Sequence, residues 1–202
     1  MISKKEGILF IVSGPSGVGK GTVISEVLKI VPDINLSISY TTRTPRKNET
    51  NGKEYFFVSE EEFNHMIERG EFLEWARVHG NLYGTPRRYI EEKLKNREDV
   101  ILEIDTQGAR QVKKVFPNGV FIFILPPSMD ELLKRLCMRG TESEDDIKLR
   151  LNNAKEELRE WEWYNYTVVN ESISLTGEII ASIIKAERHK TSRLKWDDNR
   201  LW

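Results

Sequence analysis

Short apolar runs alternate with longer amphipathic stretches along most of this chain. The runs are rich in Val, Ile and Phe, a composition typical of strands buried on both faces of a parallel sheet. Between them, apolar residues at steps of three and four in segments 23–31 and 147–161 predict helices. Alternating strands and helices indicate an α/β layered fold with right-handed crossovers. The predicted buried strands are residues 8–12, 100–104, 120–125 and 167–169.

A central segment, residues 35–89, departs from this alternation. Residues 36–40 alternate between apolar and polar as a half-exposed strand does, and two further strand-like runs follow. Residues 81–85 are predicted to form a turn. The segment therefore predicts a small insert with mixed or antiparallel strands. A second polar segment, residues 139–146, joins two predicted helices and is a candidate mobile lid.

A glycine-rich loop follows the first predicted strand and opens the first predicted helix. Glycines allow backbone N–H groups to turn toward an anion, and the helix N-terminus adds the positive end of its dipole. The lysine of the loop supplies a point charge for β- and γ-phosphates, as in phosphate-binding loops. The alternative is a glycine-rich turn without a ligand, but the strand before it and the helix after it favour phosphate binding. The predicted loop consists of Gly14, Pro15, Ser16, Gly17, Val18, Gly19, Lys20, Gly21 and Thr22.

The loop differs from the usual pattern in one position. A Ser or Thr normally follows the lysine, whereas here Gly21 intervenes and the hydroxyl is on Thr22. We therefore assign no direct protein ligand to Mg²⁺, with Thr22 as the one candidate. Water and phosphate oxygens are expected to hold the ion, because Mg²⁺ retains much of its hydration shell.

Two arginines flank a proline in the central segment. Arg43 and Arg46, with the Tyr55 hydroxyl, could converge on one phosphate, since guanidinium groups bind phosphate oxygens in pairs. Pro45 stiffens the loop and biases the preceding residue toward an extended conformation. A solvated basic turn is the alternative, and these residues alone do not decide between the two.

Carboxylates and hydroxyls further along could read a purine base. Asp105 follows a predicted buried strand, at the end where ligands bind in α/β sheets. An ionised carboxylate accepts hydrogen bonds and cannot donate them, so Glu74 and Asp105 favour the N1–H and N2–H₂ donors of guanine over adenine. Ser39 and Thr85 could donate to guanine O6. Taken alone, Glu74 is better explained as an exposed strand residue.

Composition limits the class of protein. The formal net charge of -1 indicates neither a nucleic acid nor a membrane partner. A single cysteine, Cys137, excludes an internal disulfide and suits a reducing compartment. The apolar run at residues 8–12 is too short for a signal peptide or a membrane span, so we expect a cytoplasmic protein. The sequence leaves open whether it is a monomer or a homo-oligomer.

Taken together, these motifs resemble the guanylate kinase family over residues 7–190. The resemblance implies a P-loop NTPase-type three-layer core with a parallel sheet, formed by residues 1–34, 95–128 and 151–202. It also implies a GMP-binding insert at 35–94 and a lid at 129–150. The motifs that carry it are Gly14–Thr22, Ser39–Arg46, Gly52–Phe57, Glu74–Ala76, Gly80–Thr85, Ile104–Gly108, Arg135, Arg139–Glu142, Arg150 and Val168–Asn170.

The resemblance also implies roles for single residues. In the GMP site, Arg43, Arg46, Tyr55 and Tyr83 would hold the phosphate, and Ser39, Glu74, Thr85 and Asp105 would read the base. Around ATP, Arg135, Arg139 and Arg150 would meet the phosphates, and Arg139 and Asn170 would lie near the adenine. The family requires Mg²⁺. The implied catalytic residues are Lys20, Arg43, Arg135, Arg139 and Arg150.

The expected reaction moves the γ-phosphoryl group of ATP to GMP, with dGMP as a further expected acceptor, in purine nucleotide metabolism. Two alternatives remain. One is another small-molecule kinase on the same scaffold, such as a ribose bisphosphate kinase or an adenylate-like kinase, and the other is a non-catalytic guanylate-kinase-like module that binds phosphopeptides. The paired Glu74 and Asp105 argue against the first, and the intact loop with Lys20 argues against the second. Residues 190–202 have no counterpart in the resemblance and form either a docked tail or a frayed terminus.

Overall fold

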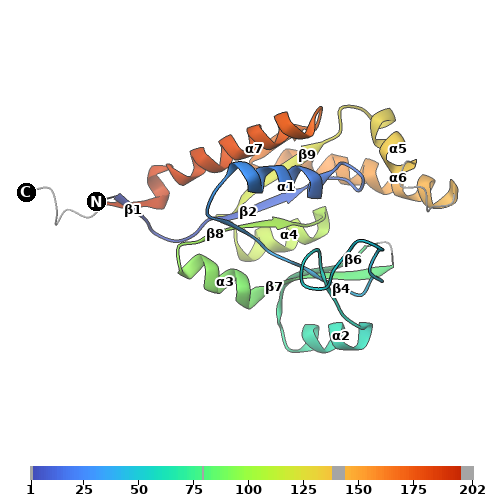
Figure 1. Cartoon of the computed structure of the whole chain (residues 1–202), viewed down its shortest axis with the longest axis horizontal. Coiled ribbons are helices and arrows are strands. Elements are labelled where there is room, and N and C mark those ends of the chain that lie inside the picture. The colour runs from blue at the N-terminus through green and yellow to red at the C-terminus, as the bar shows by residue number, and fades with distance from the viewer. Residues whose placement is uncertain (1, 79, 138–143, 197–202) are drawn as a thin grey trace, which may run out of the picture.

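The apolar runs of the sequence form a five-stranded parallel sheet at the centre of the molecule (Figure 1). The computed structural model describes residues 2–78, 80–137 and 144–196, without the side chains of 144–148. The four predicted buried strands are confirmed, each end to within one residue. In pairing order the strands are β10 (Tyr166–Val169), β9 (Val120–Leu125), β2 (Leu9–Ser13), β8 (Asp99–Glu103) and β3 (Ile34–Leu36).

Helices cover both faces of this sheet, which gives the predicted three-layer α/β fold (Figure 1). Successive strand residues point to opposite faces. Phe10 and Val12 therefore pack against α1 and α7, whereas Leu9 and Ile11 pack against α3 and α4. The covering helices are α1 (Lys20–Ile30), α7 (Ile173–Arg188), α3 (Arg87–Lys95) and α4 (Thr106–Val115).

A second, four-stranded sheet forms most of the smaller part of the molecule, below the core in Figure 1. Its strands pair in the order β5-β4-β7-β6, with β4 and β5 parallel and the other pairs antiparallel. Phe63 of α2 stacks on Phe72 of β6 with 4.4 Å between ring centroids, which anchors α2 to the sheet. The elements are β4 (Tyr40–Thr41), β5 (Phe56–Phe57), α2 (Glu60–Glu68), β6 (Phe72–Val78) and β7 (Asn81–Pro86).

Two predictions about this segment are wrong. Residues 36–40 do not form one strand, because β3 ends at Leu36 in the core sheet and β4 begins at Tyr40 in the smaller sheet. Residues 81–85 are not a turn but the greater part of β7, which pairs with β6. Chain reversal falls instead at Gly80, whose φ of 82° suits glycine. Pairing between strands, which the apolar and polar pattern of a single segment does not report, decided both cases.

The helix predicted at 147–161 is α6 (Glu144–Leu158), and it packs on α5 (Met129–Cys137) through Ala154. Trp161 is the last apolar residue of the stripe that predicts this helix and would therefore belong to the core, but its side chain is 44% exposed. The chain tightens into a 3₁₀ turn at Arg159–Trp163, which changes the residue that faces inward. Trp163 packs there instead, with its ring 5.5 Å from Phe121.

The described part of the tail pairs with the start of the chain. β11 (Leu194–Trp196) lies antiparallel to β1 (Ile2–Lys4), at the end of the molecule opposite α5 in Figure 1. The buried Asp99 carboxylate fixes this end by accepting hydrogen bonds from Lys4 at 2.8 Å and from Arg188 at 2.6 Å. Within the described ranges, no helix combines the length and the apolar character needed to cross a bilayer.

Candidate active site

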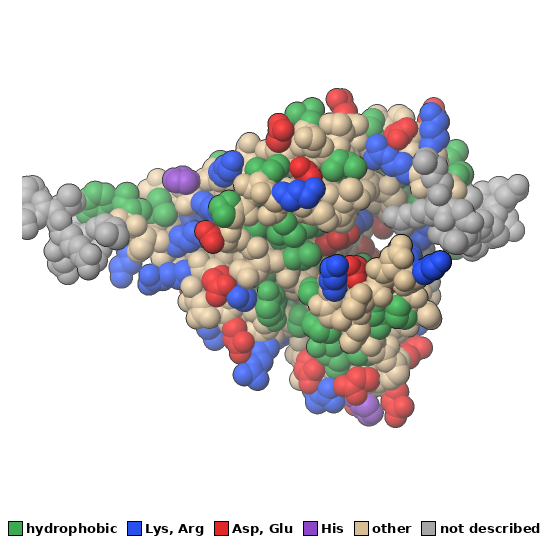
Figure 2. Space-filling model, viewed as in Figure 1, with side chains coloured by type: hydrophobic (Ala, Val, Ile, Leu, Met, Phe, Trp, Pro, Cys, Tyr) green, Lys and Arg blue, Asp and Glu red, His purple; other side chains and the backbone are tan. Residues whose placement is uncertain are grey.

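A cavity of about 320 Å³ lies between the core and the smaller sheet. Figure 2 shows the molecule hollowed between these two parts, with acidic and basic side chains near the opening. Residues from the predicted phosphate loop and from both predicted acceptor clusters share the lining. The lining residues are Ser16, Gly17, Gly19, Lys20, Gly21, Thr22, Ser39, Arg43, Arg46, Tyr55, Glu74, Ala76, Val78, Tyr83, Glu103, Ile104, Asp105, Arg150 and Glu157.

The phosphate loop connects β2 to α1 and forms the core side of the cavity. Gly17 and Gly19 have φ values of 87° and 95°, in the left-handed region that glycine adopts without strain. Gly17 also packs closely on α5, since an added Cβ would lie 2.8 Å from a methyl group of Leu136. The Lys20 ammonium donates to the Gly14 carbonyl at 2.6 Å, which holds its charge against the loop.

Three loop residues, Gly14, Pro15 and Val18, are outside the cavity lining and form the back of the loop. Arg135 and Asn170 lie behind it as well. Arg135 donates to the carbonyl oxygens of Val18 at 3.3 Å and of Asn170 at 3.4 Å. The Asn170 side chain is buried and donates to the same Val18 carbonyl at 2.8 Å. Both residues therefore contact the loop itself.

Thr22 and Glu103 supply oxygen atoms on the donor side of the cavity. A Cβ on the neighbouring Gly21 would lie 3.1 Å from a Glu103 carboxylate oxygen, so this carboxylate reaches the start of α1. Oxygen donors of this kind fit Mg²⁺. Among the described residues, no group of three or more His, Cys, Asp or Glu could hold a metal by itself. Glu103 was not predicted from the sequence, although it ends the same strand that leads to Asp105.

Arg43 lies in a cluster of polar and aromatic groups on the acceptor side. Its guanidinium donates to both carboxylate oxygens of Glu49, at 2.8 and 2.9 Å, and its Cζ lies 5.5 Å from the Tyr55 ring centroid. Burial opposes ionisation of Glu49, but hydrogen bonds from Arg43 and the Arg46 amide prevail and lower its pKa. Arg43 is therefore fixed in place as a cation. Glu49 was not predicted from the sequence as the partner of Arg43.

The other groups predicted to hold the acceptor phosphate lie around Arg43. The Tyr55 and Tyr83 rings meet edge to face at 5.8 Å, and both residues line the cavity. Burial raises the pKa of Tyr55, with the Glu103 charge adding to the effect, so its hydroxyl stays a donor. The Arg46 side chain is 60% exposed at the cavity edge.

Glu74 is buried at the base of the cavity, not exposed as the alternative had it. The β6–β7 register places it opposite Thr85, whose hydroxyl donates to Glu74 at 2.5 Å. Gly108 of α4 permits the close approach of this carboxylate, since an added Cβ would lie 2.4 Å from Glu74 Oε2. Burial, with Asp105 adding repulsion, raises the pKa of Glu74 to about 7.

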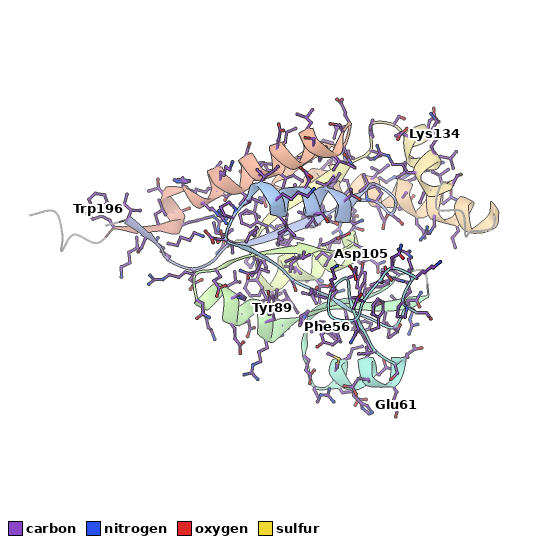
Figure 3. All side chains as sticks on the ribbon, viewed as in Figure 1. Phe56, Glu61, Tyr89, Asp105, Lys134 and Trp196 are labelled. Carbon is purple, nitrogen blue, oxygen red and sulfur yellow. The ribbon has the colours of Figure 1, made fainter. Side chains whose placement is uncertain are left out.

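Asp105 caps the N-terminus of α4 by accepting a hydrogen bond from the Gly108 amide at 2.8 Å. Figure 3 labels it where the core meets the smaller sheet. Glu74 belongs to β6 of the smaller sheet, whereas Asp105 lies between β8 of the core sheet and α4. Because α4 packs along β6, both carboxylates line the same cavity. Ser39 lines the cavity too, so the predicted base-reading residues lie together, with Thr85 buried behind Glu74.

Helix α6 contributes two further groups. Arg150, predicted to meet the ATP phosphates, lines the cavity. Glu157, which the sequence reasoning missed because no local pattern marks it, accepts a hydrogen bond from the Ser16 amide at 3.1 Å. Burial raises the pKa of Glu157, although the nearby Lys20 charge and this hydrogen bond oppose the effect. Arg139, predicted to meet ATP, lies outside the described residues.

Comparison with known proteins identifies the family of this chain. The guanylate kinase family model matches residues 6–187. A guanylate kinase from Caldanaerobacter subterraneus is 52% identical over 96% of this chain and 95% of its own. One from Geobacter sulfurreducens is 51% identical, over 95% and 94%. The crystal structure of guanylate kinase from Anaplasma phagocytophilum superposes with a TM-score of 0.80 at 37% identity, covering 95% of this chain and 91% of that one. The chain belongs to the guanylate kinase family.

Proposed function

We infer that this protein transfers the γ-phosphoryl group of ATP to GMP, giving ADP and GDP. The observation that carries the inference is the shared cavity. It has a phosphate loop with Lys20 on one side, and Arg43 with the buried Glu74 on the other. Family membership supports the same reaction.

The acceptor phosphate is proposed to bind Arg43, Arg46, Tyr55 and Tyr83. The Arg43 guanidinium is already oriented by Glu49, so little side-chain freedom is lost when the phosphate binds. The Tyr55 hydroxyl remains a donor because burial disfavours its ionisation. A guanidinium and phenolic donors together suit a dianionic phosphate.

The base is proposed to be read by Glu74 and Asp105. Guanine N1–H and N2–H₂ can donate to these carboxylates, whereas adenine would set its N1 acceptor against them. A hydroxyl donates one proton, and that of Thr85 goes to Glu74. Thr85 would therefore have to release Glu74 to serve guanine O6, which leaves Ser39 as the freer donor. With no residue assigned to the ribose 2′-hydroxyl, dGMP is a proposed substrate as well.

The chemical step breaks the bond between the γ-phosphorus and the oxygen that bridges it to the β-phosphate of ATP. It forms a bond from the same phosphorus to a phosphate oxygen of GMP. The attacking oxygen is already anionic, so no general base is required. Catalysis then depends on alignment and on neutralising the charge of the transferred group. We assign this neutralisation to Lys20, the loop amides, Arg150 and Arg139.

Mg²⁺ would neutralise phosphate charge, held through ATP and through water on Thr22 and Glu103. Arg135 would act from behind the loop, through the Val18 carbonyl that it contacts. Residues 35–94 are proposed as the GMP-binding part and 129–150 as the lid, which would close and exclude water. A cytoplasmic location, where ATP and GMP are available, belongs to the same proposal.

The test is ADP formation with ATP and Mg²⁺, offering GMP, dGMP, AMP, CMP, UMP and ribose 1,5-bisphosphate in turn. We expect turnover with GMP well above the other ribonucleotides. The Lys20→Met variant should lose turnover, whereas Lys29→Met, an exposed lysine of the same helix paired with Glu26, should not. Preference for another acceptor would overturn the base-reading roles. Folded protein without turnover would favour a binding module.

A further inference from the structure

The Val18 carbonyl is held from behind the phosphate loop by two side chains. Asn170 Nδ2 donates to it at 2.8 Å and Arg135 Nη1 at 3.3 Å. Val18 lies between Gly17 and Gly19, which have the greatest backbone freedom of any residue type. A loop with two such glycines keeps one conformation only if other groups hold it. The hydrogen bonds to the Val18 carbonyl hold it at this position.

The orientation of the Asn170 amide is itself fixed. The Val18 carbonyl can only accept, so Nδ2 is the end of the amide that faces it. The Thr176 hydroxyl, on the first turn of α7, donates to Asn170 Oδ1 at 3.1 Å, with the Val169 carbonyl at 3.4 Å as its second acceptor. The Asn170 main-chain N–H donates to the Leu125 carbonyl at 2.8 Å and continues the pairing of β10 with β9. Asn170 and Thr176 are 2% and 0% exposed. A side chain buried in this way is poorly placed to read a base in the cavity.

Peptide planarity carries this constraint into the cavity. The Val18 C=O and the Gly19 N–H belong to one trans peptide unit, so they point in opposite directions. A carbonyl turned back toward Asn170 therefore turns the Gly19 N–H toward the cavity, which Gly19 lines. Gly19 is also the N-cap residue of α1, where backbone N–H groups bind anions. The fit is close, since an added Cβ on Gly19 would lie 3.1 Å from Asn170 Nδ2.

We propose that Asn170 is a positioning residue for the phosphates of the donor nucleotide, acting through the Val18 carbonyl to aim the Gly19 N–H, and not a reader of adenine. Thr176 orients the Asn170 amide for this purpose. The proposal rests on the inferred kinase activity. A residue that holds the phosphate loop affects the reaction with every triphosphate donor alike, whereas a residue that reads adenine affects the reaction with ATP alone.

The experiment compares Asn170→Asp, Asn170→Ala and Thr176→Val with the wild type and with Asn153→Asp, an exposed control on α6. An aspartate at 170 keeps the shape of the side chain but, when ionised, has no proton to donate to Val18. Steady-state rates are measured with ATP, GTP and CTP as donors and GMP as acceptor. Binding of magnesium tripolyphosphate, which has no base, is measured by calorimetry. Thermal unfolding and GMP binding verify that each variant is folded.

We expect kcat/KM to fall roughly tenfold or more for every donor in both Asn170 variants. Each variant loses the buried hydrogen bond to Val18 and leaves the Val18 carbonyl without this donor. Tripolyphosphate binding should weaken in parallel, the KM for GMP should stay unchanged, and Thr176→Val should show a smaller loss of the same kind. A loss confined to ATP, with tripolyphosphate binding intact, would overturn the proposal in favour of adenine reading. Wild-type rates in folded Asn170→Asp would also overturn it. Tripolyphosphate binding is informative even without turnover, so failure of the proposed function is distinguishable.

Discussion

Replacing Glu74 by Gln should weaken GMP binding and at the same time stabilise the protein at neutral pH. The carboxylate is 5% exposed, and burial raises its pKa from 4.5 to about 7. A folded-state pKa above the unfolded value means that the folded chain binds the extra proton. The contribution of the protonated Glu74 to the free energy of unfolding is fully present below pH 4.5 and is lost as the pH rises through 7. Above pH 7 the wild type therefore bears the full cost of a buried charge.

The magnitude follows from the two pKa values. A difference from 4.5 to about 7 corresponds to about 3 kcal/mol in the free energy of unfolding, at 1.36 kcal/mol for each pH unit. Loss of the charge-assisted hydrogen bond from Thr85 offsets about 1 kcal/mol of this gain in the Gln variant. We therefore expect Glu74→Gln to be more stable than wild type by about 2 kcal/mol at pH 8, and of similar or lower stability at pH 4.

GMP binding should respond to the same titration. Guanine donors need the ionised carboxylate, so with a pKa of about 7 the KM for GMP in wild type should rise about fivefold between pH 7 and pH 6. The acceptor phosphate also titrates near pH 6, and Glu74→Gln reports that contribution separately because it lacks the carboxylate. The assays are urea unfolding from pH 4 to 8 and steady-state kinetics from pH 6 to 8. A variant less stable than wild type at pH 8, or parallel KM profiles in the two proteins, would refute the reasoning.

Three further predictions follow from contacts in the cavity and the core. Glu157→Gln should lower the calorimetric Kd for ATP severalfold, because it removes an anion that accepts from the Ser16 amide in the phosphate loop. Gly108→Ala should raise the KM for GMP at least tenfold, because its methyl group would clash with the Glu74 carboxylate at 2.4 Å. Asp99→Ala should lower the free energy of unfolding by about 3 kcal/mol in urea titrations, because it leaves two cations without their buried partner.

Each of these has a specific contradicting result. Unchanged or weaker ATP binding in Glu157→Gln, beside an unchanged Glu156→Gln control, would show that the carboxylate does not compete with phosphate. Normal GMP kinetics in Gly108→Ala would mean that Glu74 has room to move. A loss below about 1 kcal/mol in Asp99→Ala would place this cluster with ordinary surface ion pairs.

Most of the candidate site could be predicted from the sequence because its charged and glycine residues are grouped in short segments. The glycine loop before Lys20 and the Arg43–Arg46 pair each lie within ten residues, so their spacing carries the signal. The sequence did not single out three glutamates, Glu49, Glu103 and Glu157. Glutamates are common, and the roles of these three follow from their tertiary contacts. The Ser16 amide that bonds Glu157 is 141 residues away in the sequence.

By itself, the sequence determined the core sheet, its helices, the phosphate loop and the identity of the charged groups, since buried runs and amphipathic stripes are local consequences of burial. Only the tertiary structure decided that 81–85 is a strand, that Trp163 and not Trp161 packs inward, and that Glu74 is buried. It also placed Asn170 against the back of the loop. These outcomes depend on which strands pair and on which side chains are removed from water in the folded chain. The sequence of one segment allows several conformations, and contacts with other segments select one of them.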